Sequence, residues 1–288
     1  MKQYLDTSSI RILGSRTQEI EDSGSYSTSA VCLIELAGQL RASDTEFRQR
    51  QKWIASVLLS SVNIDWATPE EKLTLAFGLQ ASSADSRRES LKRIMKAAAI
   101  SANRGEFIRA EDALDVSPHI GYWEGYGEEL AAVWTSAVRV GSRCIWNAFT
   151  RQGKMDNRSV LIREVFGRSA PGATHATEES VFPVQVEATE RAIAAMVLTC
   201  AGMPSADAEI DRVWGGRNRS LSVFARAHAA AMLPHLRTID PPGPNDVIEL
   251  THFLYVNEDT LIISANTRLA RLARAIGVRV AGPGGIGA

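Results

Sequence analysis

Three acidic residues far apart in the chain, Asp6, Glu35 and Asp246, occupy positions where a carboxylate could take part in chemistry. Asp6 directly follows Gln3-Tyr4-Leu5, which predicts a short strand, and Asp246 opens a predicted helix with Glu249 one turn later. Carboxylates from distant segments that converge at the carboxyl edge of a parallel sheet form a site for a hard cation such as Mg²⁺ or Mn²⁺. Such an ion polarises a phosphodiester and lowers the pKa of an attacking water.

The first two of these acids also have structural interpretations. Asp6 can cap a helix that begins near Ile10, because its carboxylate accepts hydrogen bonds from free backbone N–H groups. Glu35 lies in the segment TSAVCLIELAGQL, where apolar residues cover every side of the predicted helix, so we expect it to be at least partly buried. A buried carboxylate is unfavourable unless it is paired or binds a metal, and Arg41 and Lys52 are the candidates for pairing.

The stretch from Asp240 to Gly277 predicts a helix, the fully apolar strand Leu261-Ile262-Ile263 and a second helix that stops at the glycine. Asn266 opens the second helix. Ligands bind beyond the carboxyl ends of strands in parallel sheets, so Asn266 is expected at the same edge as the acids. The spacing of Asp246 and Glu249 also fits a capping box in which aspartate replaces serine or threonine.

The two ends of the chain predict a parallel sheet covered by helices, and the middle predicts helices alone. Near the N-terminus the pattern predicts helices over Thr28–Leu40 and Thr45–Ser60, the strand Val62–Trp66 and a helix that starts at Thr68-Pro69. Helices are then predicted as far as Leu236, among them Leu91–Ala99, Glu128–Arg151, Val186–Ala201 and Leu221–Leu236. Trp123, Trp134 and Trp146 are expected to build a core for this helical region alone.

Composition argues against several classes of function. The chain has 288 residues and a net charge of −1, which argues against a strongly basic nucleic-acid-binding protein. Its three cysteines, Cys32, Cys144 and Cys200, form no CxxC pair and suit free thiols in a reducing compartment. The histidines lack the spacing of a metal site, and no GxSxG sequence points to a serine hydrolase. No signal sequence and no membrane-spanning run are found, so we expect a soluble cytoplasmic protein.

Three segments together resemble the PIN-domain nucleases, a family that includes toxins of bacterial toxin–antitoxin pairs. Tyr4–Ser8 is similar to the opening strand with its first catalytic acid, and Ser29–Leu36 to the helix that carries the second. Asn245-Asp246, followed by His252, Tyr255 and the strand Leu261–Ser264, is similar to the third acid and the closing strand. In the family that strand usually runs into Thr-Asn-Asp with a fourth acid, whereas Ser264-Ala265-Asn266 stands here.

The resemblance implies a three-layer α/β PIN-like domain, with a parallel sheet flanked by helices, formed by residues 1–66 and 237–288. Residues 67–236 would be a large all-helical insertion. The implied activity is that of a Mg²⁺- or Mn²⁺-dependent endoribonuclease, in which Asp6, Glu35 and Asp246 hold the metal and activate water. Asn266 would be a neutral ligand or a water-positioning group, and Glu249 a further ligand.

RNA is the substrate that the resemblance implies, with Ser8, Arg268 and Arg271 as expected contacts. Arg268, Arg271 and Arg274 lie at i, i+3 and i+6, a pattern that an ordinary solvated helix face also shows. An antitoxin-like protein or a second copy of the chain is a further expected partner.

The main alternative is a PIN-like fold that has lost catalysis and serves as a binding or assembly module. A third alternative, a metal-dependent phosphatase that acts on small molecules, would need a closed pocket. Asn266 and the near-neutral charge favour the binding module, whereas Glu35 in an apolar helix argues against it.

Overall fold

The computed structural model of the chain describes residues 2–20, 25–79, 84–114, 178–218, 221–238 and 244–285, together with residues 120, 121, 123, 125 and 128. The fold is α/β, with five parallel strands in the order β3-β2-β1-β4-β5. The strands are β1 (Gln3–Leu5), β2 (Tyr26–Ser29), β3 (Asn63–Asp65), β4 (Leu261–Ile263) and β5 (Arg279–Ala281). The expected parallel sheet flanked by helices is therefore confirmed.

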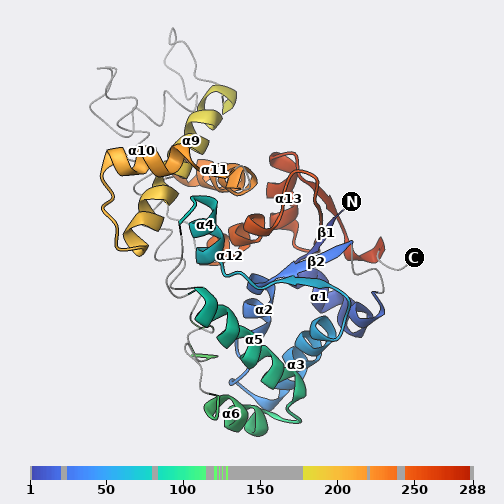
Figure 1. The fold of residues 1–288 in the computed structure, drawn as a ribbon. Helices are drawn as coiled ribbons and strands as arrows, with labels where there is room; N and C mark the ends of the chain where they lie inside the picture. The colour runs from blue at the N-terminus through green and yellow to red at the C-terminus, as the bar shows by residue number, and fades with distance from the viewer. Residues whose placement is uncertain are drawn as a thin grey trace.

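Helices cover both faces of this sheet. On one side lie α1, α2, α3 and α5, and on the other lie α11, α12 and α13, against which α9 and α10 pack farther out (Figure 1). The first set comprises α1 (Thr7–Leu13), α2 (Ala30–Ala37), α3 (Asp44–Leu58) and α5 (Ala84–Ile100), and α6 (Arg104–Asp112) packs against α3 and α5. The short helix α4 (Pro69–Ala76) contacts α9 of the second set. The second comprises α9 (Glu178–Cys200), α10 (Asp207–Gly215), α11 (Ser222–Thr238), α12 (Pro244–Thr251) and α13 (Thr267–Ala275). Three 3₁₀ helices complete the described elements: η1 (Gly14–Glu19), η3 (His252–Tyr255) and η4 (Pro283–Gly285).

The helices that begin at the sheet edge start on capping side chains. Asp6 accepts a bond from the backbone N–H of Ser9 at the start of α1, and Asn266 caps α13 in the same way. Thr68 caps α4, whose first residue is Pro69, as the sequence predicts. Gly277 follows α13 with a φ of +78°, a left-handed conformation in which a side chain would be strained. These caps place both Asp6 and Asn266 at the carboxyl edge of the sheet.

Two strands were not predicted. The helix expected over Thr28–Leu40 begins only at Ala30, because Thr28 and Ser29 belong to β2, which pairs with β1 and β3. The sequence of β2 is Tyr-Ser-Thr-Ser, which shows no apolar run or alternation, so its strand character comes from its neighbours in the sheet. The edge strand β5 has the sequence Arg-Val-Ala and is equally short.

The described helices of the middle region share one hydrophobic cluster with the sheet. Trp123, 1% exposed, packs in the same cluster as Tyr4, Phe224 and Phe253, so the expectation of a separate core is wrong for this residue. Trp134, Trp146, Cys144 and nearly all of the predicted helix Glu128–Arg151 lie outside the described residues, as does the side chain of Cys200. Cys32 is a buried free thiol. Within the described part of the chain, none of the helices is both long and apolar enough to cross a membrane.

Candidate active site

A small cavity of about 130 Å³ lies at the carboxyl ends of β1 and β4. Its lining comes from α1, α2, α12, η3 and the start of α13, and consists of Asp6, Thr7, Ser8, Arg11, Glu35, Ile248, Glu249, His252 and Asn266. Five predicted residues are thus brought together from opposite ends of the chain: the expected metal-site residues Asp6, Glu35, Glu249 and Asn266, and the expected RNA contact Ser8. Parallel pairing of β1 with β4 explains the convergence, since both strands end at the same sheet edge.

Asp6 is almost wholly buried, with 2% of its surface exposed, and hydrogen bonds occupy both carboxylate oxygens. Oδ1 accepts from the Ser9 N–H at 2.8 Å and from the Ser8 hydroxyl at 2.9 Å. Oδ2 lies 2.8 Å from the same Ser8 hydroxyl and accepts from the Ser264 hydroxyl at 2.6 Å. The capping interpretation of Asp6 is therefore confirmed, and a cation at this carboxylate would have to compete with two hydroxyl groups.

Ser8 joins the ends of the two central strands. Its hydroxyl donates to Asp6 and accepts from the backbone N–H groups of Ala265 and Asn266, at 2.9 and 3.1 Å. The hydroxyl of Ser264 also accepts from the Asn266 N–H, at 2.9 Å. The Ser8 hydroxyl, expected to contact RNA, is thus engaged within the protein and fixes the loop between β4 and α13.

Glu35 is the half-buried carboxylate of the cavity, with 25% of its side chain exposed. Its Oε2 accepts a hydrogen bond from the Thr7 hydroxyl and lies 3.2 Å from Nε2 of His252. The expected pairing with Arg41 or Lys52 is wrong, because the partners of Glu35 come from α1 and η3 instead. Burial by itself would raise the pKa of Glu35, but the adjacent His252, together with Thr7, lowers it below its ordinary value.

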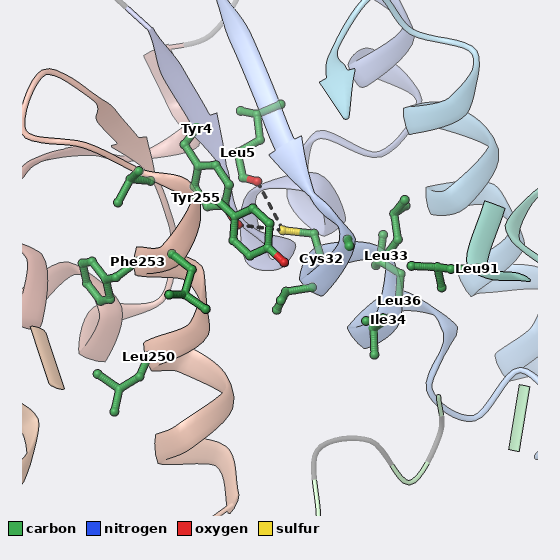
Figure 2. Packing of buried hydrophobic residues seen from close by; sticks show 14 of the residues in the cluster. Tyr4, Leu5, Cys32, Leu33, Ile34, Leu36, Leu91, Leu250, Phe253 and Tyr255 are labelled. Carbon is green, nitrogen blue, oxygen red and sulfur yellow. Dashed lines mark hydrogen bonds between the residues drawn. The ribbon is translucent and has the colours of Figure 1, made fainter. Parts of the chain in front are cut away.

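Behind Glu35 lies a buried polar network built on His252. Its Nδ1 lies 2.8 Å from the Tyr4 hydroxyl, which lies 2.7 Å from the Ser29 hydroxyl. The Cys32 thiol lies 3.4 Å from both the Tyr4 hydroxyl and the Leu5 carbonyl oxygen, and Figure 2 shows Cys32 facing these two residues from α2. Burial opposes a charge on His252, yet Cys32 and Glu35 raise the pKa of the ring well above its usual value.

Glu249 and Asn266 contact each other on the opposite side of the cavity. The Asn266 side-chain amide donates to Glu249 Oε1 at 3.0 Å, and Arg268 Nε lies 3.4 Å from Glu249 Oε2. The amide oxygen of Asn266 accepts from the backbone N–H groups of Arg268 and Leu269. The side-chain oxygen of Asn266 therefore caps α13, and its side-chain N–H donates to Glu249.

The capping-box interpretation of Asp246 and Glu249 is wrong. The helix α12 begins at Pro244, so Asp246 lies inside its first turn and not at the N-cap. Two residues of this helix, Ile248 and Glu249, line the cavity. The side chain of Asp246 lies outside the described part of the structure, so its predicted place beside Asp6 and Glu35 stays a prediction.

The arginines around the cavity differ in their surroundings. Arg11 was not predicted; it lines the cavity, and its guanidinium carbon lies 5.5 Å from the centre of the Trp53 ring. Arg268 pairs with Glu249, and Arg271 and Arg274 are exposed on α13. Sequence reasoning missed Arg11 because a single arginine in a short helix carries no local signal, and its approach to Glu35 depends on packing between distant segments.

Among the described side chains, no group of three or more histidine, cysteine, aspartate or glutamate residues is arranged to hold a metal ion. Mg²⁺ sites commonly use only one or two carboxylates and keep several waters. Glu35 suits that role, because both of its bonds in this part of the structure go to Oε2, while its side chain reaches the cavity. The residues present therefore fit a water-rich cation site better than a cage built entirely from protein ligands.

A larger depression of about 360 Å³ lies between β2, β3, α5 and η3, with Lys2, Trp66 and Lys92 in its lining. Two of its other charged residues are paired with neighbours outside that lining, Arg88 with Glu71 and Asp65 with Lys72. None of the predicted acids lines it. The smaller cavity at the sheet edge is therefore the better candidate for chemistry.

Comparisons with models of protein families, with curated proteins and with solved structures find no match to this chain. The chemistry of the cavity is therefore inferred from its own side chains.

Proposed function

We propose that this chain is a metal-dependent ribonuclease of PIN-like fold, and that the cavity at the carboxyl edge of the sheet is its active site. One observation carries this proposal. Asp6, Glu35 and Glu249, which lie in segments at opposite ends of the sequence, line the same cavity at the end of a central parallel strand pair. Oxygen ligands in this arrangement suit Mg²⁺ or Mn²⁺, and Asp246 on α12 would add a fourth carboxylate.

Glu35 is assigned as the principal ligand, because one of its oxygens is held by the protein and its side chain reaches the cavity. Asp6 lies beside it as a fixed negative charge that Ser8, Ser9 and Ser264 hold in place. When bound, the ion would polarise the phosphodiester and lower the pKa of the attacking water. Arg11 supplies a positive charge in the same cavity for the phosphate that is being cleaved.

RNA is the proposed substrate, and an antitoxin-like protein or a second copy of the chain is the proposed partner. Arg268 and Arg271 on α13 are assigned as contacts to the phosphates of RNA that extends beyond the cavity. Arg268 pairs with Glu249, which lines the cavity, and Arg271 is exposed on the same helix. Residues 67–236 remain assigned as an insertion into a PIN-like domain formed by residues 1–66 and 237–288. A cytoplasmic location belongs to the same proposal.

The test is cleavage of a mixed pool of structured and unstructured RNAs with Mn²⁺ or Mg²⁺, comparing the wild type with Glu35→Gln. Loss of the charged ligand removes several kcal/mol of transition-state stabilisation, so we expect cleavage to fall by about 100-fold or more. Glu190→Gln is the matched control, because Glu190 is a buried glutamate that bonds Trp214 and Arg217 away from the cavity. This control is expected to cleave like the wild type.

A catalytically inactive binding module is the second candidate. Two observations favour it: the amide oxygen of Asn266 is engaged by α13, and both oxygens of Asp6 are already hydrogen-bonded. In the cleavage test this candidate predicts that the wild type retains RNA without cutting it under either metal. Metal-dependent cutting that Glu35→Gln abolishes would exclude it, and cutting that survives in Glu35→Gln would overturn the assignment of the site.

A further inference from the structure

A chain of buried polar groups leads from the sheet to the carboxylate that faces the cavity. The Ser29 hydroxyl contacts the Tyr4 hydroxyl at 2.7 Å, and the Tyr4 hydroxyl contacts His252 Nδ1 at 2.8 Å. On the other side of the ring, Nε2 lies 3.2 Å from Glu35 Oε2. Ser29, Tyr4 and His252 are all buried, so this chain is shielded from water along its length.

We propose that His252 is a positioning residue, which holds Glu35 with Oε2 turned into the protein and Oε1 turned toward the cavity. The geometric part of this inference stands on the contacts alone, and its effect on metal binding rests on the proposed function. His252 belongs to η3, which directly follows α12, the helix that contributes Ile248 and Glu249 to the cavity. Its ring thus links one wall of the cavity to Glu35 on the other.

The contacts determine which ring atom donates to Glu35. In a neutral ring that accepts a bond from Tyr4 at Nδ1, the proton resides on Nε2 and points to Glu35. In a protonated ring both nitrogens donate, Nδ1 to Tyr4 and Nε2 to Glu35. The remaining tautomer would set a bare Nε2 against a carboxylate oxygen, which is repulsive. In both favourable states the same N–H holds the same oxygen of Glu35.

Glu35 differs from its neighbour Asp6 in the number of oxygens that the protein holds. The bonds of Asp6 use both oxygens, as suits a buried group with a capping role. The two donors of Glu35, the Thr7 hydroxyl and the His252 ring, both go to Oε2. Two donors on a single oxygen fix the rotation of the carboxylate and leave the other oxygen for a ligand, which is how partners behind a metal ligand usually act.

The first arm of the test needs no metal. In the ¹H–¹⁵N NMR spectrum of the metal-free wild type, we expect a downfield, exchange-protected Nε2–H signal from His252. This signal should be lost or strongly shifted in Glu35→Ala. It should survive in His228→Leu, which removes a buried histidine of α11 that does not line the cavity. The inference would be overturned if the Nε2–H signal of His252 were not protected from exchange, or if it were unchanged in Glu35→Ala.

The second arm measures Mn²⁺ affinity by electron paramagnetic resonance. Removing a partner behind a metal ligand typically weakens metal binding by about 10- to 100-fold, which is the loss expected for His252→Leu. His252→Gln, whose side-chain N–H can reach Glu35, should restore most of the affinity, and His228→Leu should leave it unchanged. If His252→Leu fails to fold, Tyr4→Phe replaces it, because it removes the hydroxyl that anchors the ring while keeping the aromatic packing; it should also weaken binding.

The outcomes separate this inference from the proposed function. If His252→Leu binds Mn²⁺ as tightly as the wild type does, the positioning role is overturned and the metal site remains. The same holds for Tyr4→Phe where that variant replaces His252→Leu. A wild type that binds no Mn²⁺ overturns the proposed function, and the NMR arm alone then decides whether His252 holds Glu35. Weakened binding in both His252→Leu and His252→Gln would show that the ring acts through packing and would overturn the inference.

Discussion

Asp6 and Glu35 are neighbours in one cavity, yet the protein treats their carboxylates differently. Asp6 completes a ring of serine and backbone donors that ties β1 to β4. Glu35 is exposed to the cavity and is held from behind by His252 and Thr7. At the residue scale, the proposed chemistry therefore depends more on Glu35 than on the acid at the end of the first strand.

The acid side of the pH–stability profile tests the electrostatics of Glu35. Because the pKa of Glu35 is lowered in the folded protein, its contribution to stability is full above the unfolded value, roughly 4.3. That contribution is lost as the pH falls through the folded pKa. We expect the advantage of the wild type over the double variant Glu35→Gln/His252→Leu to be constant between about pH 6 and 5 and to shrink below about 4.5.

Urea unfolding at a series of pH values measures this difference in the free energy of unfolding. The double variant removes both coupled groups, Glu35 and His252. Below about pH 5.5 the histidine is protonated in the folded and the unfolded chain alike, so the pH dependence of the difference comes from Glu35. A difference that stays constant down to pH 3 would contradict the pairing of Glu35 with His252.

Single residues were predictable where a local pattern marked them. Asp6 stands at the end of a short strand, and Glu35 interrupts an apolar helix, so both drew notice in the sequence. The partners of Glu35 were not predictable in this way, because Thr7 and His252 are separated from it by 28 and 217 residues. Only the pairing of β1 with β4 and the packing of η3 bring them together.

At the scale of elements, the cavity depends on how α13 begins. Asn266 caps this helix with its oxygen and holds Glu249 with its nitrogen, so one side chain couples α13 to α12. An aspartate at this position would keep the cap but would set a second carboxylate against Glu249. Asparagine at position 266 therefore lacks the charge that would attract a metal ion, but its side-chain N–H can bond Glu249 when no metal is bound.

Asn266→Asp should therefore behave differently with and without metal. Without metal, we expect a loss of about 1 kcal/mol in the free energy of unfolding at pH 7, from the lost hydrogen bond and the facing charges. With excess Mn²⁺, the variant should gain more in melting temperature than the wild type does, because the added carboxylate strengthens binding to the folded state. Thermal unfolding monitored by circular dichroism measures both effects.

Asn103→Asp supplies the matched control for this prediction. Asn103 caps α6 through a bond from the Glu106 N–H at 2.9 Å, and it does not line the cavity. Its substitution should change stability little, and Mn²⁺ should stabilise it no more than the wild type. If Mn²⁺ raised the melting temperature of Asn266→Asp no more than that of Asn103→Asp, the placement of Asn266 at a cation site would be contradicted.

The elements themselves were predictable to different degrees. The strand β4 and the helix α13 follow from the apolar triplet Leu261–Ile263, a capping asparagine and a terminal glycine, all of which act locally. The strand β2 has no such signal, because its Ser and Thr residues are buried. The hydroxyls of Ser27 and Thr28 donate to the backbone of β1, to the carbonyl oxygens of Gln3 and Leu5. The conformation of β2 is set by tertiary contacts, which override local preference.

At the scale of the whole molecule, the two ends of the chain form the centre of the sheet. The first strand pairs with β4, and the helices of the middle region pack into the same hydrophobic cluster as that pair. The described helices between β3 and β4 therefore support the sheet from outside. The proposed site can form only when both ends of the chain fold together, so metal binding should report on the intact fold.

The most direct test of the central claim is anomalous diffraction from a crystal of the wild-type protein soaked in Mn²⁺. We expect one peak in the cavity, about 2.1 Å from Glu35 Oε1 and on the side facing Asp6, with waters completing the coordination. The same peak should be absent from crystals of Glu35→Gln. An empty cavity in the wild type, or Mn²⁺ bound only elsewhere on the surface, would contradict the proposal that this edge of the sheet is a metal-dependent active site.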